Sequence, residues 1–205
     1  MSVRVTPLRT AAGLVWGLLR AWGRGAESAR APGGRHVTGD REICAYLDAR
    51  AIPYARFDHP PVFTCEAAGR LVPAEAVGIQ TKNLFLRDKR GRRHWLVVTT
   101  CEKSVDIRAL GDALDAGRLS FGSPERLLRY LGVTPGAVTL LALANDAAHE
   151  VELVIDTDVW TGVPLRCHPM TNAATLVLSK DSLEHFIAET GHRPQLLAVA
   201  AIATP

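Results

Sequence analysis

Cysteine is scarce in this chain of 205 residues, and its four cysteines lie far apart, at Cys44, Cys65, Cys101 and Cys167. No two of them have the Cys-x-x-Cys spacing that zinc sites and many redox motifs use. We therefore expect reduced thiols, no zinc site and no disulfide framework. Reduced thiols are typical of a cytoplasmic protein.

Long hydrophobic runs are also absent. The longest stretches, at residues 138–144 and 151–155, have the length of strands, whereas a membrane-spanning helix needs roughly 18 apolar residues or more. Apolar residues make up 47% of the chain and charged residues 22%, which is an ordinary globular composition. The sequence predicts a soluble, cytoplasmic protein without a membrane partner, and its length suits one domain.

Several motifs that mark common enzyme classes are missing. The chain has no Gly-x-Ser-x-Gly nucleophile turn, no glycine-lysine phosphate loop, no Gly-x-Gly-x-x-Gly dinucleotide loop and no His-Glu-x-x-His metal motif. The histidines of the chain do not show the spacing of metal ligands. We expect neither a metal ion nor another cofactor.

Acidic residues are almost absent from residues 1–36, which carry six arginines and only Glu27. This segment has a net charge of +5, which leaves −2 for residues 37–205 out of the total of +3. We expect a flexible or loosely docked basic extension. Its arginine-rich, acid-poor composition also resembles that of a transit peptide, and a mis-assigned start codon is a third explanation. Because the predicted domain, 37–205, is slightly acidic, any nucleic-acid contact should be local.

The apolar patterning predicts an α/β fold with α+β character, in which helices surround a mixed central sheet. Ser123 and Pro124 mark the start of a helix over 124–131, and Gly132 marks its end. Thr64 likewise marks the start of a helix at residue 65. A turn at Gly91 joins strands 83–87 and 94–99 as a hairpin. Further helices are expected from about residue 40 and at 65–71, 105–115 and 181–190, and further strands at 52–58, 119–121, 137–143, 151–155, 165–168, 174–178 and 195–199.

Two polar segments occur where a packed core would not need them. Lys82 and Asn83 lie directly before an apolar strand, which would hold the lysine at a fixed point. The alternative is a solvated lysine at a strand edge. Residues 132–136 form a tight turn whose backbone amides can point outward as anion donors, or which only caps the preceding helix.

A third polar segment covers residues 167–172. Neighbouring residues in a strand point to opposite faces, so Cys167 and His168 are not expected to form a nucleophile pair. His168, which is followed by a proline, is either a structural histidine or a substrate contact. Asn172 lies on the turn after it.

In this order the segments resemble the bacterial prolyl-tRNA editing family. It includes the YbaK-type deacylases, the insertion domain of bacterial prolyl-tRNA synthetases and the freestanding Ala-tRNA(Pro) deacylases. The likeness covers about residues 40–199 and is greatest to the freestanding Ala-tRNA(Pro) deacylases. It implies a single YbaK-type domain. The segments that show the resemblance are DHPPVFT at 58–64, TKNLFLRD at 81–88, LSFG at 119–122, LGVTPGAVT at 131–139, Asn145-Asp146, and His168-Pro169 with Asn172.

The resemblance implies catalytic roles for Lys82, Gly136 and His168. Lys82 would act as an electrostatic clamp on the ester carbonyl or a phosphate, because lysine ordinarily has a pKa near 10.4 and stays protonated. The loop amides would stabilise the oxyanion or align a water. His168 would position the terminal ribose, with direct base action as the second choice. The implied substrate contacts are Asn83, Gly132, Thr134, Pro135, Asn145 and Asn172.

The implied substrate is mischarged tRNA(Pro), and alanine is the first choice among the amino acids to be removed. Prolyl-tRNA synthetase is a further candidate partner. Cys-tRNA(Pro) and Ser- or Thr-tRNA deacylases remain alternatives, as does a tRNA-binding module without catalysis. The chain departs from the branch at Ala144, Cys167 and Met170, positions that can line the amino-acid pocket.

Overall fold

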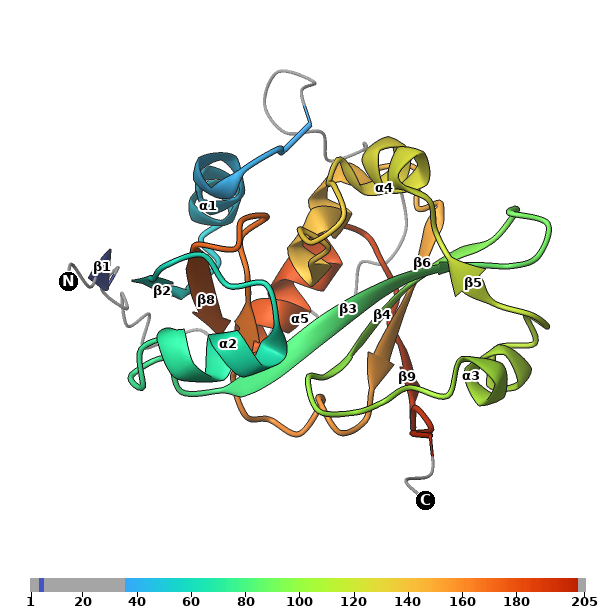
Figure 1. Cartoon of the computed structure of the whole chain (residues 1–205). Coiled ribbons are helices and arrows are strands. Elements are labelled where there is room, and N and C mark those ends of the chain that lie inside the picture. Colours follow the sequence, from blue (N-terminus) through green and yellow to red (C-terminus); the bar gives the residue numbers. More distant parts are fainter. Residues whose placement is uncertain (1–3, 6–35, 203–205) are drawn as a thin grey trace, which may run out of the picture.

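The computed structural model describes residues 4–5 and 36–202 (Figure 1). The expected basic extension lies almost entirely outside the described residues. Two of its residues, Arg4–Val5, form a short strand, β1, beside β2 (Ala55–Asp58). In the described part of the chain, no helix has the length and apolar content to cross a bilayer.

The centre of the fold is one mixed sheet, which confirms the predicted fold class. Its strand order is β1-β2-β8-β7-β3-β4-β6-β9, and β5 pairs with β3. β3 runs parallel to β7, β4 to β6 and β6 to β9, whereas the other pairs are antiparallel. The further strands are β3 (Ile79–Arg87), β4 (His94–Thr100), β5 (Ser120–Phe121), β6 (Val151–Asp156), β7 (Leu165–Cys167), β8 (Ala174–Leu178) and β9 (Gln195–Leu197).

The helices begin where the capping residues predicted. The Thr64 side chain accepts from the Ala67 amide at the start of α2 (Cys65–Leu71), and Ser123 caps α4 (Pro124–Leu131) in the same way. Gly132 ends α4 at a φ of 65°, a left-handed conformation that glycine adopts without strain. The other α-helices are α1 (Asp40–Ala49), α3 (Ile107–Ala113) and α5 (Lys180–Glu189).

The strand predicted at residues 137–143 is wrong. The chain forms a 3-10 helix there, η1 (Leu140–Asn145), which begins where Thr139 accepts a hydrogen bond from the Leu141 amide. Five consecutive residues, 140–144, are buried. A short run that is apolar on every side does not distinguish a strand from a buried helix, so periodicity could not identify this element.

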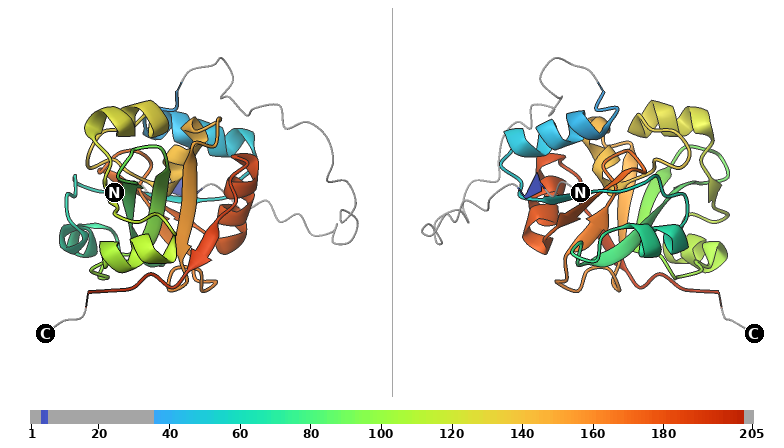
Figure 2. Two further views of the ribbon diagram at one scale, coloured as in Figure 1. Left: turned by 90° about the vertical axis from the view of Figure 1, so that its right-hand side faces the viewer. Right: turned by 60° about the vertical axis from the view of Figure 1, so that its left-hand side comes forward.

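Alternating residues of the central strands supply the cores on the two faces of the sheet. Phe85 belongs to the larger core, which also includes residues of α1, α4, α5 and η1, whereas its neighbour Leu86 belongs to a second core, with α3, on the opposite face. A third, small cluster of Phe57, Val72 and Ala76 lies beside α2. Figure 2 shows this arrangement of helices around the sheet. α2 itself has no buried residue, so apolar burial holds it only weakly.

Candidate functional site

A cavity of about 320 Å³ opens where two parallel strands separate. β3 and β7 are paired only at Ile79↔Leu165 and Gln80↔Arg166. Beyond that point β7 ends at Cys167, while β3 continues into its hairpin with β4. Divergence of adjacent parallel strands leaves a crevice at their carboxyl ends, a common location for ligands in α/β sheets.

The cavity brings together five of the nine predicted site residues. Lys82 and Asn83 come from β3, Gly136 from the loop after α4, and His168 and Asn172 from the segment after β7. These residues are separated by up to 90 positions in the sequence, and each was singled out from its local pattern. Gly132, Thr134, Pro135 and Asn145 do not line this cavity.

Lys82 is a half-buried cation whose charge is little compensated by neighbouring groups. In the described residues its ammonium group has no hydrogen bond and no ion pair within 4.0 Å. Burial lowers the pKa of Lys82, and the more distant Glu102 partly opposes this. The side chain is therefore available to an anionic or carbonyl oxygen that enters the cavity.

His168 presents an unused acceptor. Its Nε2 lies 2.8 Å from the Val138 carbonyl oxygen, which only accepts, so Nε2 carries the proton and donates. Its Nδ1 is then a bare acceptor, which is buried and has no partner among the described residues. Burial lowers the pKa of His168, although the bond to Val138 acts in the other direction. This favours the neutral ring.

The chain reverses direction directly after His168. Met170 has a φ of 56°, unusual for a residue with a side chain, and its amide donates to the His168 carbonyl. The reversal brings Asn172 back to the cavity, where its carbonyl accepts from the Val62 amide at 2.8 Å. The turn therefore also fastens the segment that leads into α2.

The loop at residues 132–136 divides into a structural half and a half that faces the cavity. Gly132 caps α4, and a side chain there would meet Asn145 Nδ2 at 2.6 Å. Gly136, with a φ of 88°, lies in open space at the cavity. Within the described residues, the amides of Gly136 and Val138 donate to no acceptor. Two unpaired amides beside a cavity can stabilise an oxyanion or orient a water.

Asn145 joins distant segments of the scaffold. Its Oδ1 accepts from the Val37 amide at 2.7 Å, and its Nδ2 donates to the carbonyls of Val37 and Leu131 at 2.8 and 2.9 Å. The neighbouring Asp146 accepts from two backbone amides and from His192. Asn145 thus fixes the segment at Val37 to the end of α4, and Asp146 fixes the start of β6 to His192, both away from the cavity.

The positions at which the chain departs from the resembling branch are mostly in the core. Ala144 and Met170 pack in the larger core and do not line the cavity. Only Cys167 lies at the cavity wall, and it is 2% exposed. Burial raises the pKa of Cys167 to about 12, so its thiol stays protonated and is a poor nucleophile.

Asn83 and three residues without an assigned role from sequence, Phe63, Thr81 and Arg166, also line the cavity. In the part of the chain that the structure describes, the Oδ1 of Asn83 is buried without a partner, as is the Nε of Arg166. Thr81 Oγ1 donates to the Arg166 carbonyl, and Phe63, 85% exposed, lies at the rim. A charged residue between two buried ones, Leu165 and Cys167, was the signal that could have identified Arg166.

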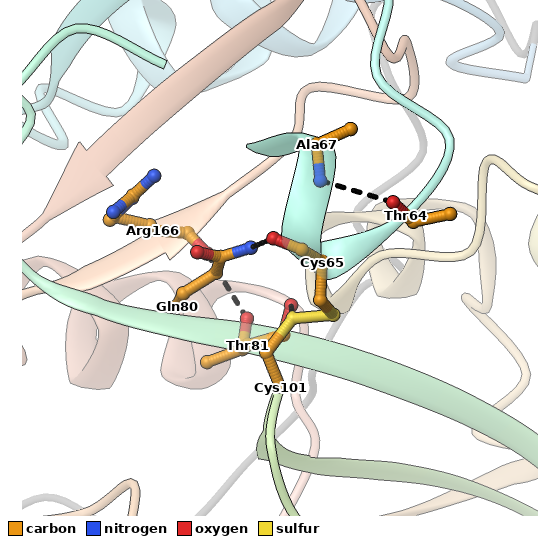
Figure 3. Close-up of a disulfide and its surroundings, with 7 residues drawn as sticks. All are labelled: Thr64, Cys65, Ala67, Gln80, Thr81, Cys101 and Arg166. Atoms are coloured by element: carbon orange, nitrogen blue, oxygen red, sulfur yellow. Dashed lines mark hydrogen bonds between the residues drawn. A yellow bond between two sulfur atoms is a disulfide. The ribbon is translucent and has the colours of Figure 1, made fainter. Parts of the chain in front are cut away.

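The prediction of four reduced thiols is wrong for Cys65 and Cys101, which form a disulfide (Figure 3). Their Cα atoms lie 5.8 Å apart, a spacing typical of disulfides. Gln80 brings them together, because its carbonyl accepts from the Cys101 amide while its Nε2 donates to the Cys65 carbonyl. The pair is 36 positions apart, so local spacing gave no sign of it. Both cysteines line the cavity.

The charge of the cavity differs from that of the domain around it. Lys82 and Arg166 are its only charged lining residues in the described chain, and no carboxylate lines it. Residues 37–205 as a whole carry −2. No group of three or more histidine, cysteine or acidic side chains among the described residues is placed to hold a metal ion.

Known proteins are similar to this chain in both sequence and fold. Residues 59–186 match the family model described as the aminoacyl-tRNA editing domain. The prolyl-tRNA editing protein ProX of Acetoanaerobium sticklandii is 39% identical over 150 residues, which cover 73% of this chain and 91% of that protein. The prolyl-tRNA synthetase associated domain-containing protein 1 of Mus musculus is 36% identical, with coverages of 76% and 94%.

A solved structure described as a candidate trans-editing enzyme for prolyl-tRNA synthetase has the same fold. It superposes with a TM-score of 0.57 at 20% identity, and covers 76% of this chain and 94% of its own. The comparisons confirm the family resemblance and, with it, the enzyme class of aminoacyl-tRNA deacylase. This chain therefore belongs to the aminoacyl-tRNA editing domain family.

Proposed function

We propose that the protein is a trans-acting deacylase that removes alanine from mischarged tRNA(Pro). The observation that carries the proposal is the cavity. It combines two cations, two unpaired amides and one unpaired imidazole nitrogen, and no carboxylate of the described residues lines it. The ProX relative, named for prolyl-tRNA editing, supports tRNA(Pro) as the carrier. Prolyl-tRNA synthetase, the source of the mischarged tRNA, is the proposed partner, and the cytoplasm the proposed location.

The reaction is attack of a water on the aminoacyl ester. The water oxygen bonds to the carbonyl carbon, and the carbonyl oxygen becomes an oxyanion. Collapse of this intermediate breaks the bond to the ribose oxygen, which takes up the proton that the water releases. An ester is already activated, so a site that orients the water and stabilises the oxyanion is sufficient.

Each group in the cavity suits one part of this reaction. The Lys82 ammonium and the Gly136 amide are donors for the oxyanion. The His168 Nδ1 is an acceptor, and we assign it to a hydroxyl of the terminal ribose, which places the ester against these donors. Asn83 and Asn172 supply amide groups for the substrate's amino and carbonyl groups.

The selectivity of the site for the amino acid rests on exclusion of the proline ring from the cavity. A missing methylene in a pocket changes transition-state binding by only about 1–3 kcal/mol, so weaker contact alone does not protect correctly charged Pro-tRNA(Pro). The proline ring must instead clash with the cavity wall. Alanine is the first choice because the motifs at 81–88 and 131–139 match the alanine branch.

The proposal is tested with tRNA(Pro) charged separately with alanine, cysteine, serine and proline. Hydrolysis of each ester is measured at equal protein concentration and corrected for spontaneous hydrolysis. We expect alanine to be released fastest and proline to be spared. Faster release of cysteine or serine would reassign the amino acid, and tRNA binding without hydrolysis of any ester would reduce the protein to a binding module.

A further inference from the structure

Arg166 is a cation without a counter-ion at the wall of the cavity. No carboxylate in the described residues lies within 4.0 Å of its guanidinium group, and its Nε is buried without an acceptor. Leaving a buried donor unpaired is energetically unfavourable, and more so for a charged group. Burial alone lowers the pKa of Arg166, with no neighbouring carboxylate to oppose it. The arrangement is unfavourable unless a ligand supplies an acceptor.

The position of Arg166 is fixed from several sides. Its backbone pairs with Gln80 on β3 and with Val177 on β8, and its carbonyl accepts from Thr81 Oγ1. Its stem packs over Gly78, where a side chain added to the glycine would place its first carbon 3.3 Å from Arg166 Cγ. Figure 3 shows Arg166 beside Gln80, near α2. The backbone and the first part of the Arg166 side chain are therefore held in place before any ligand arrives.

The chemistry of the proposed substrate decides which anion fits. The carboxyl group of an aminoacyl ester is uncharged, and its amino group is a cation that Arg166 would repel. The only anions near the 3′ end of a tRNA are the backbone phosphates. The guanidinium fork matches a phosphate with two parallel hydrogen bonds, which makes arginine a frequent phosphate ligand.

We propose that Arg166 forms a phosphate subsite for the 5′-phosphate of the 3′-terminal nucleotide of the substrate. The inference rests on the proposed function, since it names the group of the aminoacyl-tRNA that this end of the cavity binds. The phosphate would be anchored at Arg166 on β7, while the ester is oriented between Lys82 and His168. Arg166 is thus a binding and positioning residue, not a catalytic one.

The first experiment compares the binding of AMP and adenosine, which differ only in the 5′-phosphate. We expect the wild-type protein to bind AMP about tenfold more tightly or better, as charged hydrogen bonds commonly contribute. Arg166→Gln should bring the two affinities close together, and Arg166→Lys should give an intermediate ratio. Arg70→Gln is the matched control, because Arg70 is exposed on α2, pairs with Glu66 and does not line the cavity.

This readout does not depend on deacylation, so it fails separately from the proposed function. An equal AMP-to-adenosine ratio in wild-type and Arg166→Gln proteins overturns the subsite, and so does the absence of AMP binding at millimolar concentration. If the wild-type protein does not hydrolyse alanyl-tRNA(Pro), only the enzymatic proposal is overturned. Thermal unfolding of all three arginine variants verifies that they are folded.

A second experiment uses alanyl esters of adenosine and of AMP as minimal substrates. Arg166→Gln should raise the KM of the alanyl-AMP ester about tenfold and leave that of the alanyl-adenosine ester unchanged. With full-length alanyl-tRNA(Pro), the same variant should lower the dependence of log KM on log salt concentration by about 0.7, the value of one contact to a single strand. An equal loss on both minimal substrates would contradict a phosphate contact.

Discussion

Lys82 and His168 present opposite chemistry to the same cavity. The lysine offers an unpaired cationic donor, whereas the imidazole offers an unpaired acceptor at Nδ1. Neither group contacts the other through a hydrogen bond in the described chain. An ester held between them would have its carbonyl oxygen stabilised at one end and its ribose hydroxyl bound at the other.

Replacement of Lys82 by alanine should lower kcat for alanyl-tRNA(Pro) on the order of 10²–10³-fold, the usual effect of removing one oxyanion donor. Lys82→Arg, which keeps the charge, should retain more activity than Lys82→Ala. Single-turnover rates at saturating tRNA measure the effect. Lys89→Ala, an exposed lysine on the turn of the same hairpin, is the control. Near-normal turnover of folded Lys82→Ala would remove Lys82 from the reaction.

The pH dependence of activity should reflect His168. Its Nδ1 accepts only when it is unprotonated, and burial lowers the pKa of His168 below the ordinary value of about 6.5. The value of kcat/KM should therefore stay constant as pH falls to about 6.5 and decline only below it. His168→Ala should lose about 10- to 100-fold in kcat/KM and lack this decline. A decline that persists unchanged in His168→Ala would assign it to another group.

At the scale of elements, the loop after α4 and helix α2 border the cavity in different ways. The loop is fixed by the Gly132 cap and by a hydrogen bond from the Ala137 amide to the Thr134 carbonyl. α2 has no buried residue and depends on its Thr64 cap, the bond from Gln80 and the disulfide. The loop is thus positioned by its own backbone, and α2 by links to other elements.

Gly136→Val should impair alanine removal, because the added side chain enters the cavity beside the unpaired amides. We expect a loss on the order of 10²-fold in kcat. Gly162→Val is a closely matched control, because Gly162 has a φ of 90°, against 88° at Gly136, and lies in open space outside the cavity. Both variants carry similar backbone strain. Equal losses of activity in the two would attribute the effect to strain alone.

Removal of the disulfide by Cys101→Ser should loosen α2. The link closes a loop of 36 residues, and its loss should cost about 2–4 kcal/mol of unfolding free energy. Hydrogen exchange should become faster at residues 65–71, and KM for alanyl-tRNA(Pro) should rise several-fold. A thiol reductant should change the wild-type protein in the same direction and leave Cys101→Ser unaffected. Unchanged exchange in α2 would show that the other contacts suffice.

At the scale of the whole molecule, a buried ion pair fastens the sheet to the C-terminal segment. Asp156 on β6 is fully buried and accepts from Thr99 Oγ1 at 2.6 Å and from Lys103 Nζ at 2.7 Å. Lys103 also donates to the Val199 carbonyl beyond β9. Burial by itself would raise the pKa of Asp156, but the bonds from Lys103 and Thr99 outweigh it and lower the pKa.

This pair should make stability depend on pH in the acid range. Because the folded pKa of Asp156 lies below the unfolded value of about 3.9, its contribution is fully present above about pH 4 and is lost as pH falls further. Asp156→Asn should cost about 3–5 kcal/mol in urea unfolding at neutral pH, and less at about pH 3. Asp158→Asn, the exposed partner of Lys103, should cost at most about 1 kcal/mol. A loss independent of pH would contradict the ionic origin.

Sequence alone determined the features that depend on neighbouring residues. Thr64, Ser123 and Gly132 predicted helix ends because capping acts within one turn. The hairpin that joins β3 and β4 followed from the glycine at its turn, Gly91. Lys82 and His168 were recognisable because each lies in a polar segment beside an apolar one, within a motif that resembles a known family. Lys82 nevertheless stands inside β3, paired with Thr99, and not directly before the strand as expected.

Only the tertiary structure decided which distant groups meet. Asn145 binds Val37 across 108 positions, so no local pattern could show that it is a structural residue and not a substrate contact. Cys65 bonds to Cys101 across 36 positions, so no local pattern could show that these cysteines form a disulfide. The burial of residues 140–144 on all sides likewise made η1 appear as a strand. Arg166 became a candidate because the separation of β3 from β7 leaves its charge without a partner, which depends on how strands pair.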